Sequence, residues 1–475
     1  MTSYPVHVVF PGRLIFVGFG SIGQGVLPLI LRHVGIQADQ VTIVTADEAG
    51  EKIAQEYGVR FVKQPLTRQN FKKVLDPIVG RGDFLLNLSV DVSSIALIKF
   101  CWEKGSLYLD TCIEPWPGGY TDPTVAPARR TNYALREEAL TLKDSKQRAP
   151  TAVLTHGANP GLVSHLVKQA LLNIAADTGV ETAEPGTRAD WAALAHKLGV
   201  KVIHVAERDT QVGNRQKEPN EFVNTWSVDG FVGEGCQPAE LGWGSHEKNF
   251  PRDAKRHVTV PPGTAPAIYL MQPGAATRVR TWTPLAGPIH GFLITHSEAI
   301  SIADYLTVKK GEQVQYRPTV HYAYHPSDAA VLSVHELAGR NWRMQDSKRI
   351  MMDDIVKGVD ELGVLLAGHK KNAYWYGSQL SVQEARQLAP HNSATSLQVT
   401  VSAMAGLIWA IENPNSGIVE PDDIDYKRIL EICRPYLGLV VGEYSEWHPL
   451  VDRGRMFPED LDETDPWQFK NVRVV

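Results

Sequence analysis

A glycine-rich turn near the N-terminus constrains the fold of this 475-residue chain more than any other feature. Apolar residues 14–17 run directly into the turn, Gly18-Phe-Gly-Ser-Ile-Gly23, and a second apolar run covers residues 26–31. A continuous apolar run is typical of a strand that is buried on both faces of a parallel sheet. The glycines that follow predict a tight turn from that strand into a helix. Residues 14–31 therefore predict the first strand–turn–helix unit of an α/β fold.

The spacing of these glycines is that of a turn that binds a dinucleotide. The first, Gly18, permits the tight bend, the second, Gly20, lets a pyrophosphate approach the backbone, and the third, Gly23, lets helix and strand pack closely. Ser21 and Ile22 lie between them at the helix N-terminus, where free N–H groups and the helix dipole favour a phosphate. We therefore expect these five residues to bind a cofactor. A glycine turn in some other α/β unit is the alternative.

A carboxylate further along the chain supports the dinucleotide interpretation. Asp47 ends a second apolar run, Val41-Thr-Ile-Val-Thr-Ala-Asp, roughly 20 residues beyond the glycines. An acidic side chain at that place accepts a hydrogen bond from the ribose 2′-hydroxyl of the cofactor. No arginine follows Asp47 directly to bind a 2′-phosphate, so we expect NAD rather than NADP.

Strands and helices alternate over the first part of the chain. The expected strands cover residues 14–18, 41–46, 59–62, 84–88, 106–110 and 152–156. Alternation at this spacing predicts a Rossmann-like open parallel sheet, and ligands bind outside the C-terminal strand ends of such sheets. The polar residues at those ends are Ser89, Asp91, Asp110, Thr111, Glu114, His156 and Asn159. We expect the first four to contact NAD. The alternative for Asp110 is a carboxylate that only accepts hydrogen bonds from the turn backbone.

Three segments follow from these patterns. Residues 1–156 form the NAD-binding domain, and residues 157–392 form a second, α+β domain that binds the substrate. The expected strands of the second domain are short runs among Gly, Pro and Trp residues, at 201–205, 221–231, 290–295, 305–308 and 320–324. Residues 393–475 begin with a long apolar helix that we expect to return to the first domain, and residues 458–467 are expected to be a surface tail.

Composition narrows the possible partners. The net charge is −5 with no block of like charges, which argues against a nucleic-acid or membrane partner. No apolar run approaches the roughly 20 residues of a membrane helix, and the N-terminus lacks the features of a signal peptide. The four cysteines are widely spaced without a CxxC pair, so we expect reduced thiols, no metal site and a cytoplasmic location.

Further stretches carry a resemblance to a known family. They are Asn87-Leu-Ser-Val-Asp-Val-Ser-Ser, Tyr108-Leu-Asp-Thr-Cys-Ile-Glu-Pro-Trp, His156-Gly-Ala-Asn-Pro-Gly-Leu, Asn224-Thr-Trp-Ser-Val-Asp-Gly-Phe and Gly291-Phe-Leu-Ile-Thr-His-Ser-Glu. With the glycine turn, they resemble the saccharopine-dehydrogenase-like superfamily. Within it, the chain is similar to the bacterial homospermidine synthase family over essentially its whole length. The resemblance implies a homodimer that keeps NAD bound, with the second domain also serving dimerisation. It also implies that the enzyme joins two putrescines into homospermidine with release of ammonia, or uses spermidine as the aminobutyl donor.

The residue types fit a cationic substrate. Putrescine is a dication, so its site needs carboxylates and aromatic faces, and a tryptophan ring attracts an ammonium group by cation–π interaction. With the resemblance, we expect Trp226, Glu207, Glu234 and Glu114 to bind the substrate. The alternatives are a core tryptophan and solvated glutamates at strand ends.

Catalytic roles are expected at three further side chains. His296 and Glu298 alternate with Ser297, so a strand would place both on one face, as a proton relay or an ammonium clamp. A histidine hydrogen-bonded inside a sheet is the alternative. We expect His296 to accept a proton from the attacking amine, with Glu298, Asn159 and Glu207 also in catalytic roles. Asn159 is also expected to bind the substrate, because its amide can accept a hydrogen bond from an ammonium or donate one to an imine. Asn159 could instead cap the helix that starts at residue 160.

Two other functions remain open. A reductive dehydrogenase for saccharopine or carboxynorspermidine would need a basic group opposite a substrate carboxylate, for which Arg278 and Arg280 are the candidates. A non-catalytic dinucleotide sensor is the second. The pair His321 and His325 resembles a metal motif, but no further ligands complete it, and a hydrogen-bonded strand is expected there.

Overall fold

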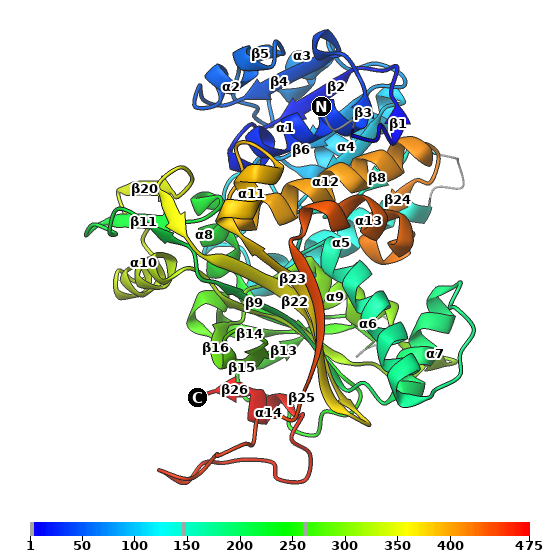
Figure 1. The fold of residues 1–475 in the computed structure, drawn as a ribbon, viewed down its shortest axis with the longest axis vertical. Helices are drawn as coiled ribbons and strands as arrows, with labels where there is room; N and C mark the ends of the chain where they lie inside the picture. Colours follow the sequence, from blue (N-terminus) through cyan, green and yellow to red (C-terminus); the bar gives the residue numbers. More distant parts are fainter. Residues whose placement is uncertain (1–3, 145–148, 260–263) are drawn as a thin grey trace.

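The computed structural model describes residues 4–144, 149–259 and 264–475 and contains two large sheets (Figure 1). The smaller sheet has seven strands, all parallel, in the order β24-β8-β7-β6-β2-β4-β5. Its strands are β2 Leu14–Val17, β4 Val41–Thr45, β5 Arg60–Lys63, β6 Phe84–Asn87, β7 Leu107–Asp110, β8 Ala152–Val153 and β24 Ile418–Val419. The Rossmann-like parallel sheet expected from the sequence is confirmed.

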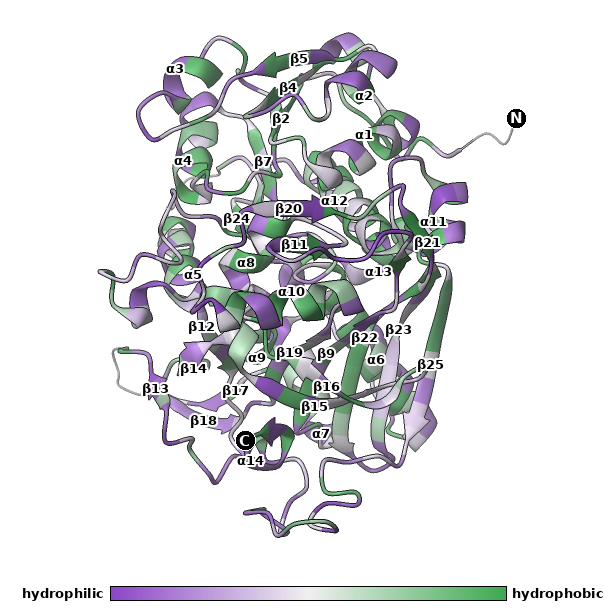
Figure 2. Ribbon diagram, turned by 90° about the vertical axis from the view of Figure 1, so that its left-hand side faces the viewer, coloured by the Kyte–Doolittle hydropathy of each residue, from purple (hydrophilic) through white to green (hydrophobic). Residues whose placement is uncertain are grey.

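Apolar sequence explains why these strands occupy the centre of the sheet. Every residue of β2, β6 and β7 is buried, because helices cover both faces of a parallel sheet. Figure 2 shows green, hydrophobic stretches along inner strands and more purple, hydrophilic residues on peripheral helices and loops. The helices of this part are α1 Ser21–His33, α2 Glu51–Glu56, α3 Phe71–Leu75, α4 Ser94–Lys104 and α5 Asn132–Leu140.

The larger sheet has eleven strands and is mixed. Its main path runs β13-β14-β12-β19-β9-β22-β23-β25, with β16, β15 and β26 branching from β19. Only β9 and β19 pair in parallel along it. The strands are β9 Val202–Asp209, β12 Pro238–Gly242, β13 Ala254–Arg256, β14 Ala267–Pro273, β15 Arg278–Thr283, β16 Gly287–Phe292, β19 Thr319–His325, β22 Val359–His369, β23 Asn372–Ser381, β25 Leu439–Ser445 and β26 Arg473–Val474.

The remaining elements lie around both sheets. The helices are α6 Leu162–Thr178, α7 Arg188–Leu198, α8 Val228–Cys236, α9 Ser297–Tyr305, α10 Asp328–Gly339, α11 Val382–Leu388, α12 Ala394–Glu412, α13 Tyr426–Cys433 and α14 Phe469–Val472. Short strand pairs are β1 Val8–Val9 with β3 Val34–Gly35, β10 Val212–Gly213 with β21 Ile355–Lys357, β11 Glu221–Asn224 with β20 Ser347–Ile350, and β17 Val308–Lys310 with β18 Gln313–Tyr316.

Four expected strands differ in the structure. The runs 152–156 and 290–295 are strand only as far as residues 153 and 292, and two others are partly replaced by helices. Only residues 221–224 of the run 221–231 form a strand, β11, because Ser227 caps a helix, α8, through the backbone N–H of Gly230. The run 305–308 is divided between the end of α9 and the start of β17. In both places a short apolar run allowed either a strand or a helix, and tertiary packing selected the helix.

The segment after residue 392 contributes to both sheets. Helix α12 packs against α1 and β7, and β24 extends the parallel sheet. Strands β25 and β26 instead join the larger sheet, so this segment is not wholly helical. Although α12 is long and apolar enough to pass for a membrane span, most of it is buried inside the protein, as in a core helix.

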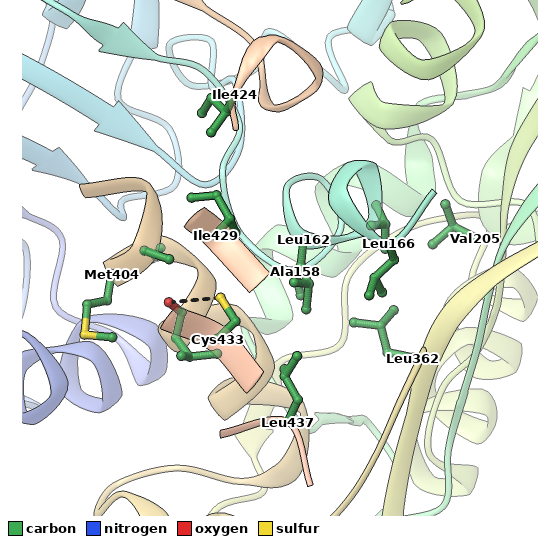
Figure 3. Packing of buried hydrophobic residues seen from close by; sticks show 14 of the residues in the cluster. Ala158, Leu162, Leu166, Val205, Leu362, Met404, Ile424, Ile429, Cys433 and Leu437 are labelled. Atoms are coloured by element: carbon green, nitrogen blue, oxygen red, sulfur yellow. Dashed lines mark hydrogen bonds between the residues drawn. The ribbon is translucent and has the colours of Figure 1, made fainter. Parts of the chain in front are cut away.

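One apolar cluster joins the two parts of the molecule. Figure 3 shows Leu166 of α6 near Leu362 of β22, and Met404 of α12 on the other side of Cys433 of α13. The same cluster reaches Phe16 in β2. Burial of these side chains therefore fixes the larger sheet against the parallel sheet, and the polar residues between the two sheets are held in place by this packing.

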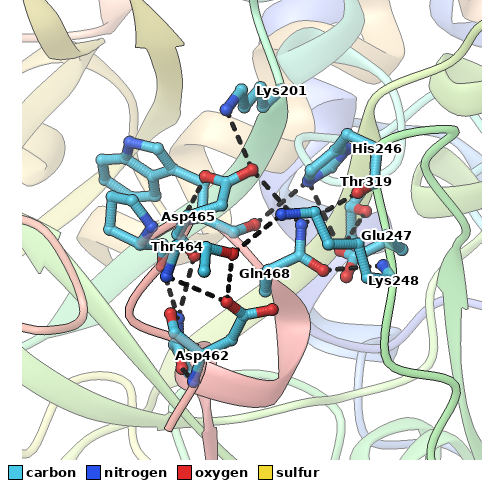
Figure 4. A network of polar contacts seen from close by, with 12 residues as sticks. Lys201, His246, Glu247, Lys248, Thr319, Asp462, Thr464, Asp465 and Gln468 are labelled. Carbon is cyan, nitrogen blue, oxygen red and sulfur yellow. Dashed lines mark hydrogen bonds and ion pairs between the residues drawn. The ribbon is translucent and has the colours of Figure 1, made fainter.

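The expected surface tail is in part anchored. Asp465 accepts a bond from Lys201 at 2.9 Å, and Trp467 is 3% exposed. Figure 4 shows Asp465, Gln468 and His246 in one polar network with Lys201 and Thr319, at the starts of β9 and β19. The Asp-rich composition looked solvated because its partners are distant in sequence. Residues 458–464 remain mostly exposed, as expected.

Candidate active site

A cavity of about 570 Å³ lies between the two sheets and gathers most of the predicted site residues. Those that line it are Gly18, Gly20, Ser21, Ile22, Asp47, Ser89, Asp91, Thr111, Glu114, Asn159, Glu207, Trp226, Glu234 and His296. They come from the C-terminal ends of the parallel strands on one side and from β9, α8 and the chain before α9 on the other. The structure therefore places an expected dinucleotide site and an expected amine site in one cavity.

The glycine turn has the geometry that a pyrophosphate requires. Gly18 has a φ of +86°, and a Cβ atom there would lie 2.7 Å from the backbone of Ser89. At Gly20, by contrast, a Cβ would meet no protein atom within 4 Å, so the open space beside it belongs to the cavity. Gly20 precedes α1 without a side-chain cap, which leaves the first N–H groups of the helix free for a phosphate.

Asp47 has a carboxylate oxygen available for a ligand in the cavity. It follows β4, lines the cavity and is exposed, and its Oδ1 accepts a bond from the backbone N–H of Ala49 at 2.9 Å. Oδ2 has no partner among the described residues, so this oxygen can accept a bond from a 2′-hydroxyl.

We predict that Asp47→Ala weakens NAD binding and narrows the preference for NAD over NADP. Replacing the carboxylate removes an acceptor for the 2′-hydroxyl and a negative charge that repels a 2′-phosphate, so we expect roughly a tenfold change in the NAD/NADP ratio of Kd. Calorimetric titration with both cofactors measures it. Glu48→Ala is the matched control, since Glu48 is exposed beside Asp47 but pairs with Lys63 outside the cavity. Equal affinity of the wild-type protein for NAD and NADP would contradict the prediction.

Three predicted residues do not line the cavity. A Cβ at Gly23 would lie 2.9 Å from the ring of Phe19, so this glycine serves the packing of the turn. Asp110 is fully buried below the cavity, where it accepts bonds from the Tyr108 hydroxyl and the Thr155 backbone N–H. These bonds fit the alternative interpretation of Asp110, in which its carboxylate accepts hydrogen bonds inside the protein and does not contact NAD. Glu298 is 1% exposed and reaches the cavity only through His296.

His296 is held between two carboxylates. Its Nε2 lies 2.9 Å from Oε2 of Glu234, and its Nδ1 lies 3.3 Å from Oε1 of Glu298. The expectation that residues 296 and 298 share one face of a strand is wrong, because His296 is the N-cap residue of α9 and Glu298 lies in its first turn. The two side chains still meet, since the cap residue and the second helical residue are close in space.

Electrostatics set the charge of these groups. Burial lowers the pKa of His296, but the charges of Glu234 and Glu298 outweigh burial and raise it to about 10. His296 is therefore protonated at neutral pH. Burial raises the pKa of Glu207 and of Glu114 to about 8 each, so both carboxyls are largely protonated at neutral pH until a cation enters.

Further carboxyl groups line the cavity on the side of the parallel sheet. Glu114 accepts a bond from the backbone N–H of Asp91 through Oε2, and Asp91 itself has a raised pKa because of burial and of the charge of Asp229. No arginine or lysine is among the described residues that line the cavity. The cavity is therefore suited to cations rather than to carboxylate substrates.

Trp226 lies in the loop between β11 and α8, not in a strand. It is half-buried, lines the cavity and donates its Nε1–H to the hydroxyl of Tyr324 at 3.2 Å. Its ring packs on Phe231 at 5.6 Å. Trp226 is thus held by Tyr324 and Phe231 at the border of the cavity, where an indole ring is available for a cation–π contact.

Asn159 donates its Nδ2–H to Oε2 of Glu207 at 3.0 Å. It does not cap the next helix, because the N-cap of α6 is Gly161, which makes no side-chain cap bond. His156 also differs from a cavity residue, since it is fully buried with its Nε2 3.1 Å from Nε2 of His165.

Sequence reasoning missed Tyr322. Its hydroxyl donates to Oε2 of Glu207 at 2.6 Å, and its ring lies 4.5 Å from that of His296. The run Thr319–His325 was considered for its histidines, but Tyr322 lies on the opposite face of β19 from His321 and lines the cavity. The hydrogen-bonded strand expected at His321 and His325 is present as β19, although neither ring nitrogen of His321 has a hydrogen-bond partner among the described residues. The described part of the chain holds no cluster of metal ligands.

The arginine pair lies elsewhere. Arg278 bonds His335 and covers the ring of Phe292, and Arg280 bonds His290. Neither lines the cavity. The pair therefore gives no support to a site for a substrate carboxylate.

Comparison with known proteins identifies the family. Residues 14–154 match the saccharopine dehydrogenase NADP binding domain, and residues 157–444 match the saccharopine dehydrogenase C-terminal domain. A homospermidine synthase of Blastochloris viridis is 53% identical, with all of both chains covered. That of Mesorhizobium japonicum is 52% identical over 99% of this chain and 98% of its own.

The chain belongs to the homospermidine synthase family. A crystal structure of the homospermidine synthase of Legionella pneumophila in complex with NAD superposes with a TM-score of 0.92, at 50% identity and with both chains fully covered. Saccharopine dehydrogenase of Saccharomyces cerevisiae shares the fold, with a TM-score of 0.54 at 9% identity over 91% of this chain and all of its own. The family assignment from the sequence motifs is confirmed, and NAD is the cofactor that the glycine turn and Asp47 fit.

Proposed function

We propose that this protein catalyses the NAD-dependent synthesis of homospermidine. Two putrescines condense with release of ammonia, or spermidine donates its aminobutyl group to putrescine with release of diaminopropane. The observation that carries the proposal is one cavity that is lined both by the glycine turn and by several carboxyl groups. No arginine or lysine is among the described residues that line it. Membership in the homospermidine synthase family supports it.

The lining of the cavity offers partners for both ends of a diamine. Glu234 and Glu207 attract ammonium groups deep in the cavity, and the ring of Trp226 attracts one by cation–π interaction. Glu114 lies near the turn after β7, on the cofactor side. An ammonium within about 4–6 Å lowers the pKa of a carboxyl. Binding of putrescine therefore converts Glu207 and Glu114 to carboxylates and releases protons.

Bound NAD supplies a hydride acceptor for the amine-bearing carbon and returns the hydride at the end of the cycle, so the reaction is redox-neutral. The residues of this chain handle the protons and exclude water. His296, charged between Glu234 and Glu298, donates a proton to the departing amine. Once neutral, it accepts the proton that the attacking amine gives up. Asn159 and Glu207 orient the reacting imine, and exclusion of water from the cavity on substrate binding would limit its hydrolysis to an aldehyde.

Two statements rest on the resemblance and on composition. We propose that the protein acts as a homodimer, and that it works in the cytoplasm on putrescine and other polyamines. Size-exclusion chromatography with light scattering measures the oligomeric state.

Incubation with putrescine and NAD tests the function directly. We expect homospermidine and ammonia in equal amounts, with no net NADH, because each hydride removed is returned. Mass spectrometry of the products and absorbance at the NADH band measure both. Net NADH turnover would instead indicate a dehydrogenase, and absence of product would indicate a dinucleotide sensor. Either outcome contradicts the proposal.

A further inference from the structure

Two tyrosines of β19 contact the side chains that would hold the substrate, and Tyr322 itself lines the cavity. The hydroxyl of Tyr322 donates to Glu207, and the hydroxyl of Tyr324 accepts from Nε1 of Trp226. Their rings stack at 5.1 Å with an interplanar angle of 15°, and the ring of Tyr322 also lies against that of His296. Both tyrosines are buried, at 3% and 0% exposure. Three substrate-facing groups therefore share one rigid support.

The hydrogen bonds to Glu207 all reach the same carboxyl oxygen. Tyr322 and Asn159 both donate to Oε2, at 2.6 and 3.0 Å. No hydrogen bond from the described residues reaches Oε1 of this carboxyl. Two donors on one oxygen hold the carboxylate plane still and leave the second oxygen for a ligand, and hydrogen bonds to the charged form favour that form.

We propose that Tyr322 is a positioning residue that acts through Glu207: its hydroxyl holds Oε2 so that Oε1 faces the substrate amine as a carboxylate. The inference rests on the proposed function and adds a residue to that site. The bond of Tyr322 opposes burial, which otherwise keeps Glu207 protonated. The titratable groups that face Glu207 are Asp209 on its own strand, Tyr322 and Tyr324 on β19, His296 before α9 and Asp360 on β22.

The sign of the expected pH effect follows from this arrangement. Burial raises the pKa of Glu207, the hydrogen bond from Tyr322 opposes that rise, and the resulting pKa is about 8. Tyr322→Phe removes the donor, so the pKa rises further and the active carboxylate forms only at higher pH. We expect the acidic limb of kcat/KM for putrescine to move up by about one pH unit, a roughly tenfold loss at fixed pH on that limb. Rates at high pH should approach those of the wild type.

Tyr324→Phe is the matched control. It removes a hydroxyl from the same strand and the same stack but keeps both donors of Glu207. We expect a lower efficiency without movement of the acidic limb. Replacing Tyr322 site-specifically with 3-fluorotyrosine keeps the ring and makes the hydroxyl a stronger donor, so the limb should move down. This second variant keeps the test decisive if Tyr322→Phe does not fold.

Full pH profiles of all four proteins, with the product identified in each reaction, decide the question. Limb shifts in opposite directions for the two Tyr322 variants, with none for Tyr324→Phe, support the proposal. Parallel profiles, or equal shifts in Tyr322→Phe and Tyr324→Phe, overturn it while homospermidine formation stands. A wild-type protein that forms no homospermidine overturns the proposed function and this inference together.

Discussion

Gly20→Val is expected to yield a folded protein that carries no NAD. Gly20 has extended backbone angles, φ −73° and ψ −158°, which valine adopts readily, and an added Cβ meets no protein atom within 4 Å. The added methyl groups instead enter the cavity space beside the N-terminus of α1, where a pyrophosphate must approach. We expect NAD affinity and activity to fall by about a hundredfold or more, equivalent to about 2.7 kcal/mol.

The measurements are NAD content of the purified protein, calorimetric affinity and melting temperature. Gly339→Val is the matched control, because Gly339 is exposed at the end of α10, away from the cavity, and its Cβ also meets nothing within 4 Å. The control should keep NAD and lose little stability. A Gly20→Val protein that still binds NAD like the wild type would show that this turn is not the pyrophosphate site.

Trp226→Ala is expected to lower kcat/KM for putrescine by roughly thirtyfold. A desolvated ammonium gains about 2 kcal/mol from an indole face, and the substitution removes that face from the cavity. Trp226→Phe should retain part of the efficiency, since benzene is a weaker form of the same quadrupole. It also loses the Nε1 bond to Tyr324, so it does not recover the wild-type value.

Stability must be separated from recognition in this experiment. Trp102→Ala is the matched control, because Trp102 is half-buried and donates one bond, to the carbonyl of Pro150, outside the cavity. NAD occupancy and melting temperature are measured on every variant. Wild-type efficiency in Trp226→Ala would rule out the cation–π contact. If Trp226→Ala loses activity only in proportion to a loss of stability, Trp226 serves packing and does not bind the substrate.

The charge of His296 could not be predicted from the sequence. The sequence suggested a proton acceptor on a strand, and the role itself remains a proposal. The structure gives a helix-capping histidine whose pKa is raised to about 10 by Glu234 and Glu298. Glu234 lies 62 positions away in sequence, so no local pattern reveals that pair. The secondary structure of residues 296–298 was equally hidden, because a short run can begin a helix or continue a strand.

Local chemistry is what the sequence by itself determined. Buried apolar runs, the glycine turn and Asp47 are short patterns whose geometry depends on neighbouring residues, so the parallel sheet, NAD as the cofactor and the family followed from them. The tertiary structure alone decided which distant groups meet. It brought Tyr322 to Glu207 and joined β25 and β26 to the larger sheet, because burial and pairing between remote segments set those contacts. The proton affinity of the cavity depends on the same remote contacts, since burial and neighbouring charges set each pKa.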